Sequence, residues 1–266
     1  MRQEDYAALS HAKALLEAPG FAIKAANYLG RPIEFALEKI DSKTLNRATR
    51  KALEHSLDIA ISTIDRSDFS NRAPSNRWHK VLVGGSGAFG GFFGLSALAI
   101  ELPISTTIML RSIAQIAHCQ GNDLSDIGTR FACLEVFALG SDRTDDDDGA
   151  ESAYYAARSG LAFEMKMALK AVEGMSEKAI QQALARGDMP VLVKLISSIA
   201  SRFGITVSEK LVAQAVPVIG AGGGAAINLV FIDHFQQMAE GHFIVKRLEN
   251  IYGPNHVRES YESIVI

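Results

Sequence analysis

Apolar side chains recur along most of this chain at intervals of three or four residues, the spacing of one face of an α-helix. One such stripe is formed by Tyr154, Ala157, Leu161, Met165, Ala168 and Val172. A second, longer stripe begins with small residues and comprises Gly220, Gly224, Asn228, Phe231, Phe235, Met238, His242 and Val245. Alternating strand patterns are scarce. The sequence therefore predicts an all-α fold, a multi-helix bundle.

Short sequences that favour helix ends, turns or loops separate the predicted helices. Residues 101–103 (ELP) predict a turn between two apolar helices. Residues 206–209 (TVSE) have the pattern of a capping box, which predicts the start of the last long helix. Residues 140–149 contain four consecutive aspartates and predict a solvated acidic loop. Calcium binding is the alternative for this loop, although the ligand spacing of a calcium loop is absent.

Two apolar segments, residues 81–100 and 217–232, are rich in glycine. Each glycine in a helix costs about 1 kcal/mol relative to alanine, so several together need compensation. Close approach of two helix backbones supplies it. We therefore expect a glycine zipper, with the two helices packed centrally or in contact with a membrane. Its expected contact residues are Gly87, Gly90, Gly91, Gly94, Gly220 and Gly224.

The first glycine-rich segment is also long enough to span a bilayer, which needs about 20 apolar residues. A returning helix would carry Arg111 only eight residues past Pro103, close to the bilayer centre. Three alternatives stay open: a hairpin buried in the fold, a stable membrane span, and a hairpin that is buried in solution but inserts into a membrane or lies on one.

Composition and charge restrict the class of protein. The 266 residues have a formal net charge of −3, so the global basic field of a nucleic-acid binder is absent. The two cysteines are too few for a disulfide scaffold, and we expect neither a metal nor a cofactor. The N-terminus lacks the apolar core of a signal peptide, which favours the cytoplasm. We expect one domain over residues 1–266, with N-terminal helices in 1–65, a core in 77–252 and a short tail in 253–266.

Four polar residues lie within otherwise apolar helices and are expected to be buried: Glu101, Arg111, Glu135 and Asn228. A buried charge is costly unless it is paired. The sequence therefore predicts an internal ion pair of Arg111 with Glu101 or Glu135. A role for Arg111 in gripping a ligand is the alternative.

The candidates for acid–base chemistry are Asp233, His234 and His242, and they define a hydrolase as one alternative function. The two histidines are eight residues apart on one helix. The competing interpretation is that His242, within the apolar stripe, is a hydrogen-bonded core histidine.

A second enzymatic alternative is an NAD(P)-binding oxidoreductase. Gly85, Gly87 and Gly90 follow an apolar run in the G-x-G-x-x-G pattern that cradles a pyrophosphate. Arg111 would then follow a second strand at residues 107–110. The motif needs β-α-β alternation around it, and the flanking sequence is helical on both sides.

Several motifs together resemble the EcsC family. They are residues 102–107 (LPISTT), 110–114 (LRSIA), 133–140 (CLEVFALG), 217–221 (PVIGA) with Asn228, 235–243 (FQQMAEGHF) and 247–249 (RLE). The resemblance covers about residues 30 to 253. The family is named after a protein encoded beside an ABC-transporter ATPase and permease, and it has no established catalytic residues. The resemblance implies a bacterial protein linked to membrane transport or membrane homeostasis.

We therefore expect a non-enzymatic cytoplasmic protein, associated with the inner membrane or a membrane transport complex through its glycine-rich helices. Its expected partners are a membrane lipid or a membrane protein. A soluble scaffold that binds a protein beside Arg111 is a further alternative.

Overall fold

The computed structural model describes residues 1–30, 42–63, 95–140, 152–214 and 220–265. Every regular element within these ranges is an α-helix, which confirms the predicted all-α fold. The ten helices are α1 (Gln3–Leu16), α2 (Phe21–Leu29), α3 (Ser42–Thr63), α5 (Leu95–Cys119), α6 (Ile127–Leu139), α7 (Ala153–Val172), α8 (Glu177–Arg186), α9 (Pro190–Gln214), α10 (Gly220–Tyr252) and α11 (Pro254–Ser263).

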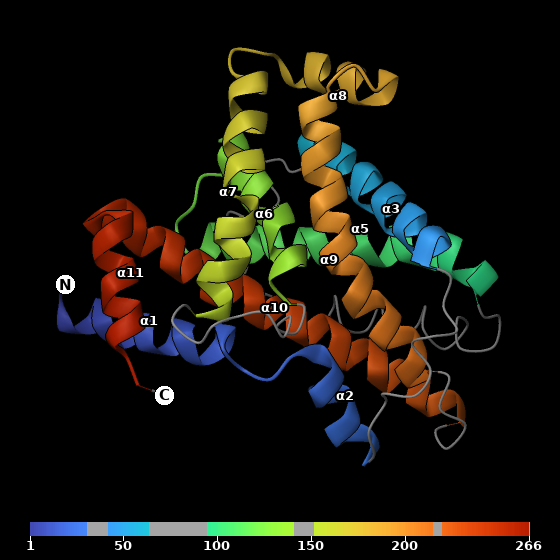
Figure 1. The fold of residues 1–266 in the computed structure, drawn as a ribbon, viewed down its shortest axis with the longest axis horizontal. Helices are drawn as coiled ribbons and strands as arrows, with labels where there is room; N and C mark the ends of the chain where they lie inside the picture. Colours follow the sequence, from blue (N-terminus) through green and yellow to red (C-terminus); the bar gives the residue numbers. More distant parts are fainter. Residues whose placement is uncertain (31–41, 64–94, 141–151, 215–219, 266) are drawn as a thin grey trace.

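The 33-residue helix α10 crosses the whole molecule and contacts α1, α2, α5, α6, α9 and α11 (Figure 1). Helices α7 and α9 pack against each other and stand across α10 in this view. Residues 253–266 were expected to form a short tail, but they contain α11, which buries Val257 and Tyr261.

An aromatic cluster joins α2, α6 and α9 to the middle of α10. Its neighbouring ring centroids lie 4.8–6.2 Å apart, within the range of favourable aromatic pairs. The cluster consists of Phe21, Phe137, Phe203, Phe231 and Phe235. The predicted stripe of α10 is confirmed over its described side chains, because Asn228, Phe231, Phe235, Met238, His242 and Val245 are all buried.

Two predicted helix boundaries are wrong. Pro103 lies inside α5, which runs without interruption from Leu95 to Cys119. A proline in a helix costs about 3 kcal/mol, and the packing of α5 against α3 and α10 outweighs this cost. The capping-box sequence lies inside α9, where Thr206 is fully buried and the Ser208 hydroxyl donates to the Ile205 carbonyl at 2.6 Å. Burial of Phe203 and Val207 keeps this segment helical.

A close approach of two helices occurs at Gly241, where α10 packs against α1. A Cβ at this position would lie 2.6 Å from Leu16 Cγ and 3.0 Å from the Ala12 carbonyl oxygen. Leu16 can move only at the expense of the core in which it is buried, and Ala12 O belongs to the backbone. Glycine thus permits a close contact between α10 and α1 at Gly241. Gly241 is not one of the glycines of the predicted zipper.

Gly241→Ala is expected to lower the free energy of unfolding by about 1–3 kcal/mol, because the added methyl group overpacks the α1–α10 contact. Urea denaturation measures this change. Gly160→Ala in α7 is the matched control: Gly160 is exposed and its new methyl group would meet only the flexible end of Arg202. Equal stability of the two variants would contradict the tight contact.

Candidate functional site

The structure places a buried polar cluster where α6, α7 and α10 meet. We call Glu135, Tyr154, Arg158, His242 and Glu249 the polar cluster. Glu135 comes from α6, Tyr154 and Arg158 lie one turn apart on α7, and His242 and Glu249 lie seven residues apart on one face of α10. His242 is fully buried, and Glu135 is 6% exposed.

Arg158 is the centre of the polar cluster. Its two terminal nitrogens donate to the two carboxylate oxygens of Glu249 at 2.7 and 3.1 Å, a bidentate pair. One of them also donates to the Tyr154 hydroxyl at 3.3 Å. Arg158 Nε lies 3.9 Å from Glu135 Oε1, so the same cation stabilises a second carboxylate at longer range.

The hydrogen bonds of the polar cluster define the state of His242. Tyr154 accepts from Arg158, so its own hydrogen is available to His242 Nδ1, 3.0 Å away. Nδ1 is then the acceptor of a neutral imidazole, and Nε2–H faces Glu135 Oε2 at 3.6 Å. Burial, together with the nearby charges of Arg158 and Lys246, keeps the pKa of His242 well below its ordinary value. His242 is therefore a hydrogen-bonded core histidine, as the competing interpretation predicted.

Burial raises the pKa of Glu135, and the Arg158 cation opposes this shift. Burial also raises the pKa of Tyr154. Burial thus disfavours the charged forms of Glu135, Tyr154 and His242, and the bidentate Arg158–Glu249 pair is the shortest ion pair of the polar cluster. This arrangement orients buried side chains around a partly buried charge pair.

The other candidate histidine belongs to a separate environment. His234 Nε2 lies 3.0 Å from the Gly140 carbonyl, and Nδ1 lies 3.4 Å from Lys24 Nζ, which also donates to Gln237 Oε1. Asp233 accepts from Gln237 on its own helix. His234 and His242 are eight residues apart along α10, a rise of about 12 Å, and have different partners. The structure therefore does not bring Asp233, His234 and His242 into one hydrolytic site.

The predicted ion pair of Arg111 is wrong. Arg111 is exposed on α5, while Glu101 pairs with Lys210 of α9 at 2.9 Å and Glu135 faces Arg158 and His242. Helical periodicity places a residue on a face, but it does not identify which neighbouring helix supplies the opposite charge. Asn228 is buried and accepts from Gln214 at 3.2 Å.

The nucleotide-binding alternative loses its second strand, because residues 107–110 lie inside α5. Its glycine loop, Gly85 to Gly90, lies outside the described residues, as do Gly91, Gly94 and residues 141–149 of the acidic loop. Gly220 and Gly224 lie in the first turns of α10. The packing of these two glycines lies outside the described residues.

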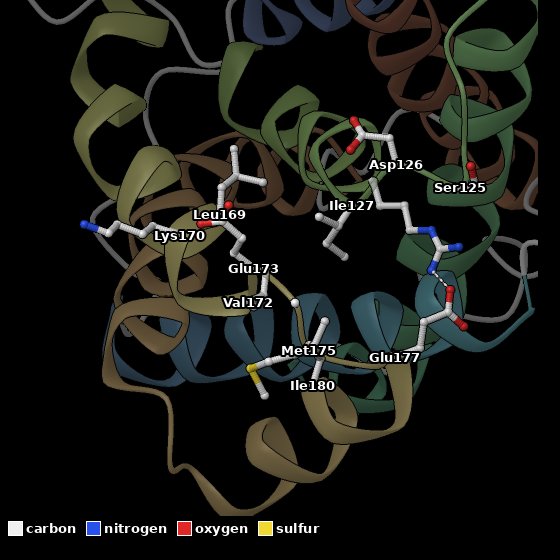
Figure 2. A pocket seen from close by; sticks show the side chains of 12 residues that line it. Ser125, Asp126, Ile127, Leu169, Lys170, Val172, Glu173, Met175, Glu177 and Ile180 are labelled. Atoms are coloured by element: carbon white, nitrogen blue, oxygen red, sulfur yellow. Dashed lines mark ion pairs between the residues drawn. The ribbon is translucent and has the colours of Figure 1, made fainter.

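Two cavities lie beside α7. The first, shown in Figure 2, has a volume of about 640 Å³ and lies between α6, the end of α7 and α8. Its buried cation, Arg130, donates to the Leu124 carbonyl and pairs with Glu177 at 2.7 Å (dashed line in Figure 2). Asp126 on its rim caps α6 through the Thr129 amide. The charges of Arg130 and Asp126 thus already have structural partners.

The second cavity, of about 460 Å³, opens beside the polar cluster between α7 and the start of α11. We call it the α7–α11 cavity. Its lining includes Glu135, Tyr155, Arg158, Glu249 and Arg258. Sequence reasoning selected Glu135 but missed Arg158 and Glu249. The available signal was their phase, since Arg158 follows Tyr154 by four residues and Glu249 follows His242 by seven. In the part of the chain that the structure describes, no three His, Cys, Asp or Glu side chains gather to hold a metal ion.

Comparison with family models matches residues 22–248 to the EcsC protein family, most of the chain. Comparison with curated proteins and with solved structures gives no match. Among the described helices, α9 is long and apolar enough to cross a bilayer, and half of its most apolar stretch is buried in the protein. A core helix of a soluble protein has the same properties, so α9 by itself is weak evidence for a membrane span.

Proposed function

Since this chain belongs to the EcsC protein family, we propose that it is a non-enzymatic cytoplasmic protein that associates with the inner membrane or with a membrane transport complex. The contact is made through the two glycine-rich segments, residues 81–100 and 217–232. The proposal concerns binding, and its partner is a membrane lipid or a membrane protein.

The observation that carries the proposal is the position at which these segments join the described fold. Helix α5 begins at Leu95, near the end of the first glycine-rich segment, and α10 begins at Gly220, near the start of the second. The two helices contact each other, and both begin at the right of Figure 1. Two apolar segments far apart in the sequence therefore attach to the same end of the molecule. A protein that docks on a membrane with one surface needs this arrangement.

The polar groups near this end have partners inside the protein. Lys210 is 3% exposed, pairs with Glu101 at 2.9 Å and lies 5.0 Å from the centre of the Phe231 ring. Gln214 donates to Asn228. Polar groups that enter an apolar environment must be paired internally. The pairing of these side chains is compatible with an adjoining apolar contact surface.

Flotation of the purified full-length protein with vesicles of phosphatidylethanolamine and phosphatidylglycerol tests the proposal. The wild type is expected to float with the vesicles. Phe92→Asp combined with Phe93→Asp should lower this partitioning at least about tenfold, because two apolar contacts with the bilayer are lost. Replacing Gly87 and Gly91, or Gly220 and Gly224, with leucine is expected to disrupt folding or partitioning.

The matched control is Phe163→Asp on α7, where Phe163 is 66% exposed. Helix α7 stands to the left of the starts of α5 and α10 in Figure 1. This variant should float like the wild type. Thermal unfolding of each variant separates loss of binding from loss of folding. A wild type that stays out of the vesicle fraction, and that cross-links to no membrane protein in cells, would refute the proposal.

A further inference from the structure

The first ten residues of α3 carry a concentration of positive charge. Residues 42–51 contain Lys43, Arg47, Arg50 and Lys51 and no acidic residue, although the whole chain has a net charge of −3. Cations near the start of a helix oppose its dipole, and Lys43, Arg47 and Lys51 repel one another at intervals of four residues. The helix thus forms against its local charge preferences. Sequences that break a local rule in this way are expected at functional sites.

Three of these cations line a groove between α3 and α9, two helices that contact each other and cross in Figure 1. We call it the α3–α9 groove, and its volume is about 480 Å³. Its lining from α9 consists of Ser197, Ala200 and Ser201, which lie on one helix face because they are three or four residues apart. These small side chains leave room between the helices. One turn further along α9, a Cβ at Gly204 would lie 3.1 Å from Asn46 Oδ1, so the helices approach closely there.

Two of the three cations in the α3–α9 groove have no charge partner. Arg50 Nε lies 2.9 Å from Oε1 of Glu54, one turn further along α3. Arg47 and Lys51 are exposed, and among the residues that the structure describes neither side chain makes an ion pair or a hydrogen bond. Glu54 is the one carboxylate in the described lining of the groove. Arg47 and Lys51 are therefore available to a negatively charged ligand.

Neutral hydrogen-bond donors accompany these cations. The Asn46 amide and the Ser201 hydroxyl belong to exposed residues that line the groove. The Ser197 hydroxyl already donates to the Val193 carbonyl at 2.7 Å. The groove thus presents two cations and two neutral donors. A phosphate monoester, with about two negative charges near neutral pH and several acceptor oxygens, has the charge and the acceptors that this set of groups requires.

We propose that the α3–α9 groove binds a phosphate monoester. Arg47 and Lys51 balance its charge, and Asn46 and Ser201 donate hydrogen bonds to its oxygens. A soluble phosphate ester and a lipid with a phosphomonoester headgroup carry the same group, so the experiment compares these two sources. The site is separate from the proposed membrane contact, because no residue in its described lining belongs to either glycine-rich segment.

Calorimetric titration of the full-length protein without vesicles tests the groove with glycerol 3-phosphate, dihexanoyl phosphatidic acid and acetate. At least one of the two phosphate compounds is expected to bind saturably, and more weakly at high salt. Acetate, with one charge, should bind at least about tenfold more weakly. Arg47→Gln combined with Lys51→Gln should weaken phosphate binding at least about tenfold. Since this change also removes repulsion within α3, the thermal midpoint of the free variant should equal or exceed that of the wild type.

Lys166→Gln combined with Lys170→Gln is the matched control. It removes two exposed cations that are also four residues apart, on α7 and outside the groove. This variant should bind like the wild type. Equal affinity for the two phosphate compounds assigns the site to soluble esters, whereas at least about tenfold tighter binding of the lipid assigns it to a headgroup. The proposal is overturned if neither phosphate compound saturates, if acetate binds as tightly, or if the two double variants have equal affinity.

Discussion

Replacing Arg158 with methionine is expected to lower the free energy of unfolding by about 3–5 kcal/mol, the largest effect of a single substitution that we foresee. The change leaves Glu249, whose side chain is 12% exposed, without its bidentate partner. Tyr154 loses its donor, and Glu135 loses the cation that lowers its pKa. Methionine keeps most of the apolar stem, so the loss comes mainly from the unpaired carboxylate.

Urea denaturation measures this loss against two further variants. Arg186→Met, at the exposed end of α8, removes a cation outside the cluster and should change stability by less than about 0.5 kcal/mol. Arg158→Met combined with Glu249→Met removes both charges and should recover part of the stability. A single Arg158 variant no less stable than the Arg186 control would show that the polar cluster contributes nothing to the fold.

Acidification is expected to destabilise the protein through His234. Burial, with the nearby Lys24 cation, lowers the pKa of His234 to about 3 in the folded protein. In the unfolded chain the imidazole titrates near 6.5. Between these values the unfolded chain binds a proton that the folded state does not bind. The stabilisation is therefore complete above pH 6.5 and falls with decreasing pH, by up to about 1.4 kcal/mol per pH unit.

The variant His234→Gln isolates this effect from the other titrating groups. Glutamine can still donate to the Gly140 carbonyl but takes up no proton. The stability difference between wild type and variant should therefore shrink by about 1.6 kcal/mol from pH 6.5 to pH 5. NMR resonances of the His234 ring should show a neutral imidazole throughout this range. A pH-independent stability difference would contradict the low pKa.

Periodicity predicted the helices well where one face is buried along its whole length. The stripe of α10 from Asn228 to Val245 is an example, because each step of three or four residues returns to the same core. Local breaking signals were less reliable. Pro103 and the TVSE sequence both mark helix ends when considered alone. In α5 and α9 the neighbouring helices bury the flanking side chains, and this burial outweighs the local preference.

The candidate site was predicted only in part, for a related reason. A polar residue in an apolar helix is visible in the sequence, so Glu135 and His242 were selected. Their partners are specified by the packing of α7 against the rest of the bundle. Arg158 lies on the same helix face as Tyr154, but this phase does not identify its partners, and Arg111, another arginine among apolar residues, is exposed. Pairing between distant helices is a property of the tertiary fold.

The contact between α1 and α10 has a consequence for the order of folding during synthesis. Gly241, against which Ala12 and Leu16 pack, is translated more than two hundred residues after them. While the ribosome makes the intervening chain, the buried face of α1 lacks its partner and stays open to water or to a chaperone. Docking of α1 is therefore a late event, and it closes a loop that includes almost every other helix.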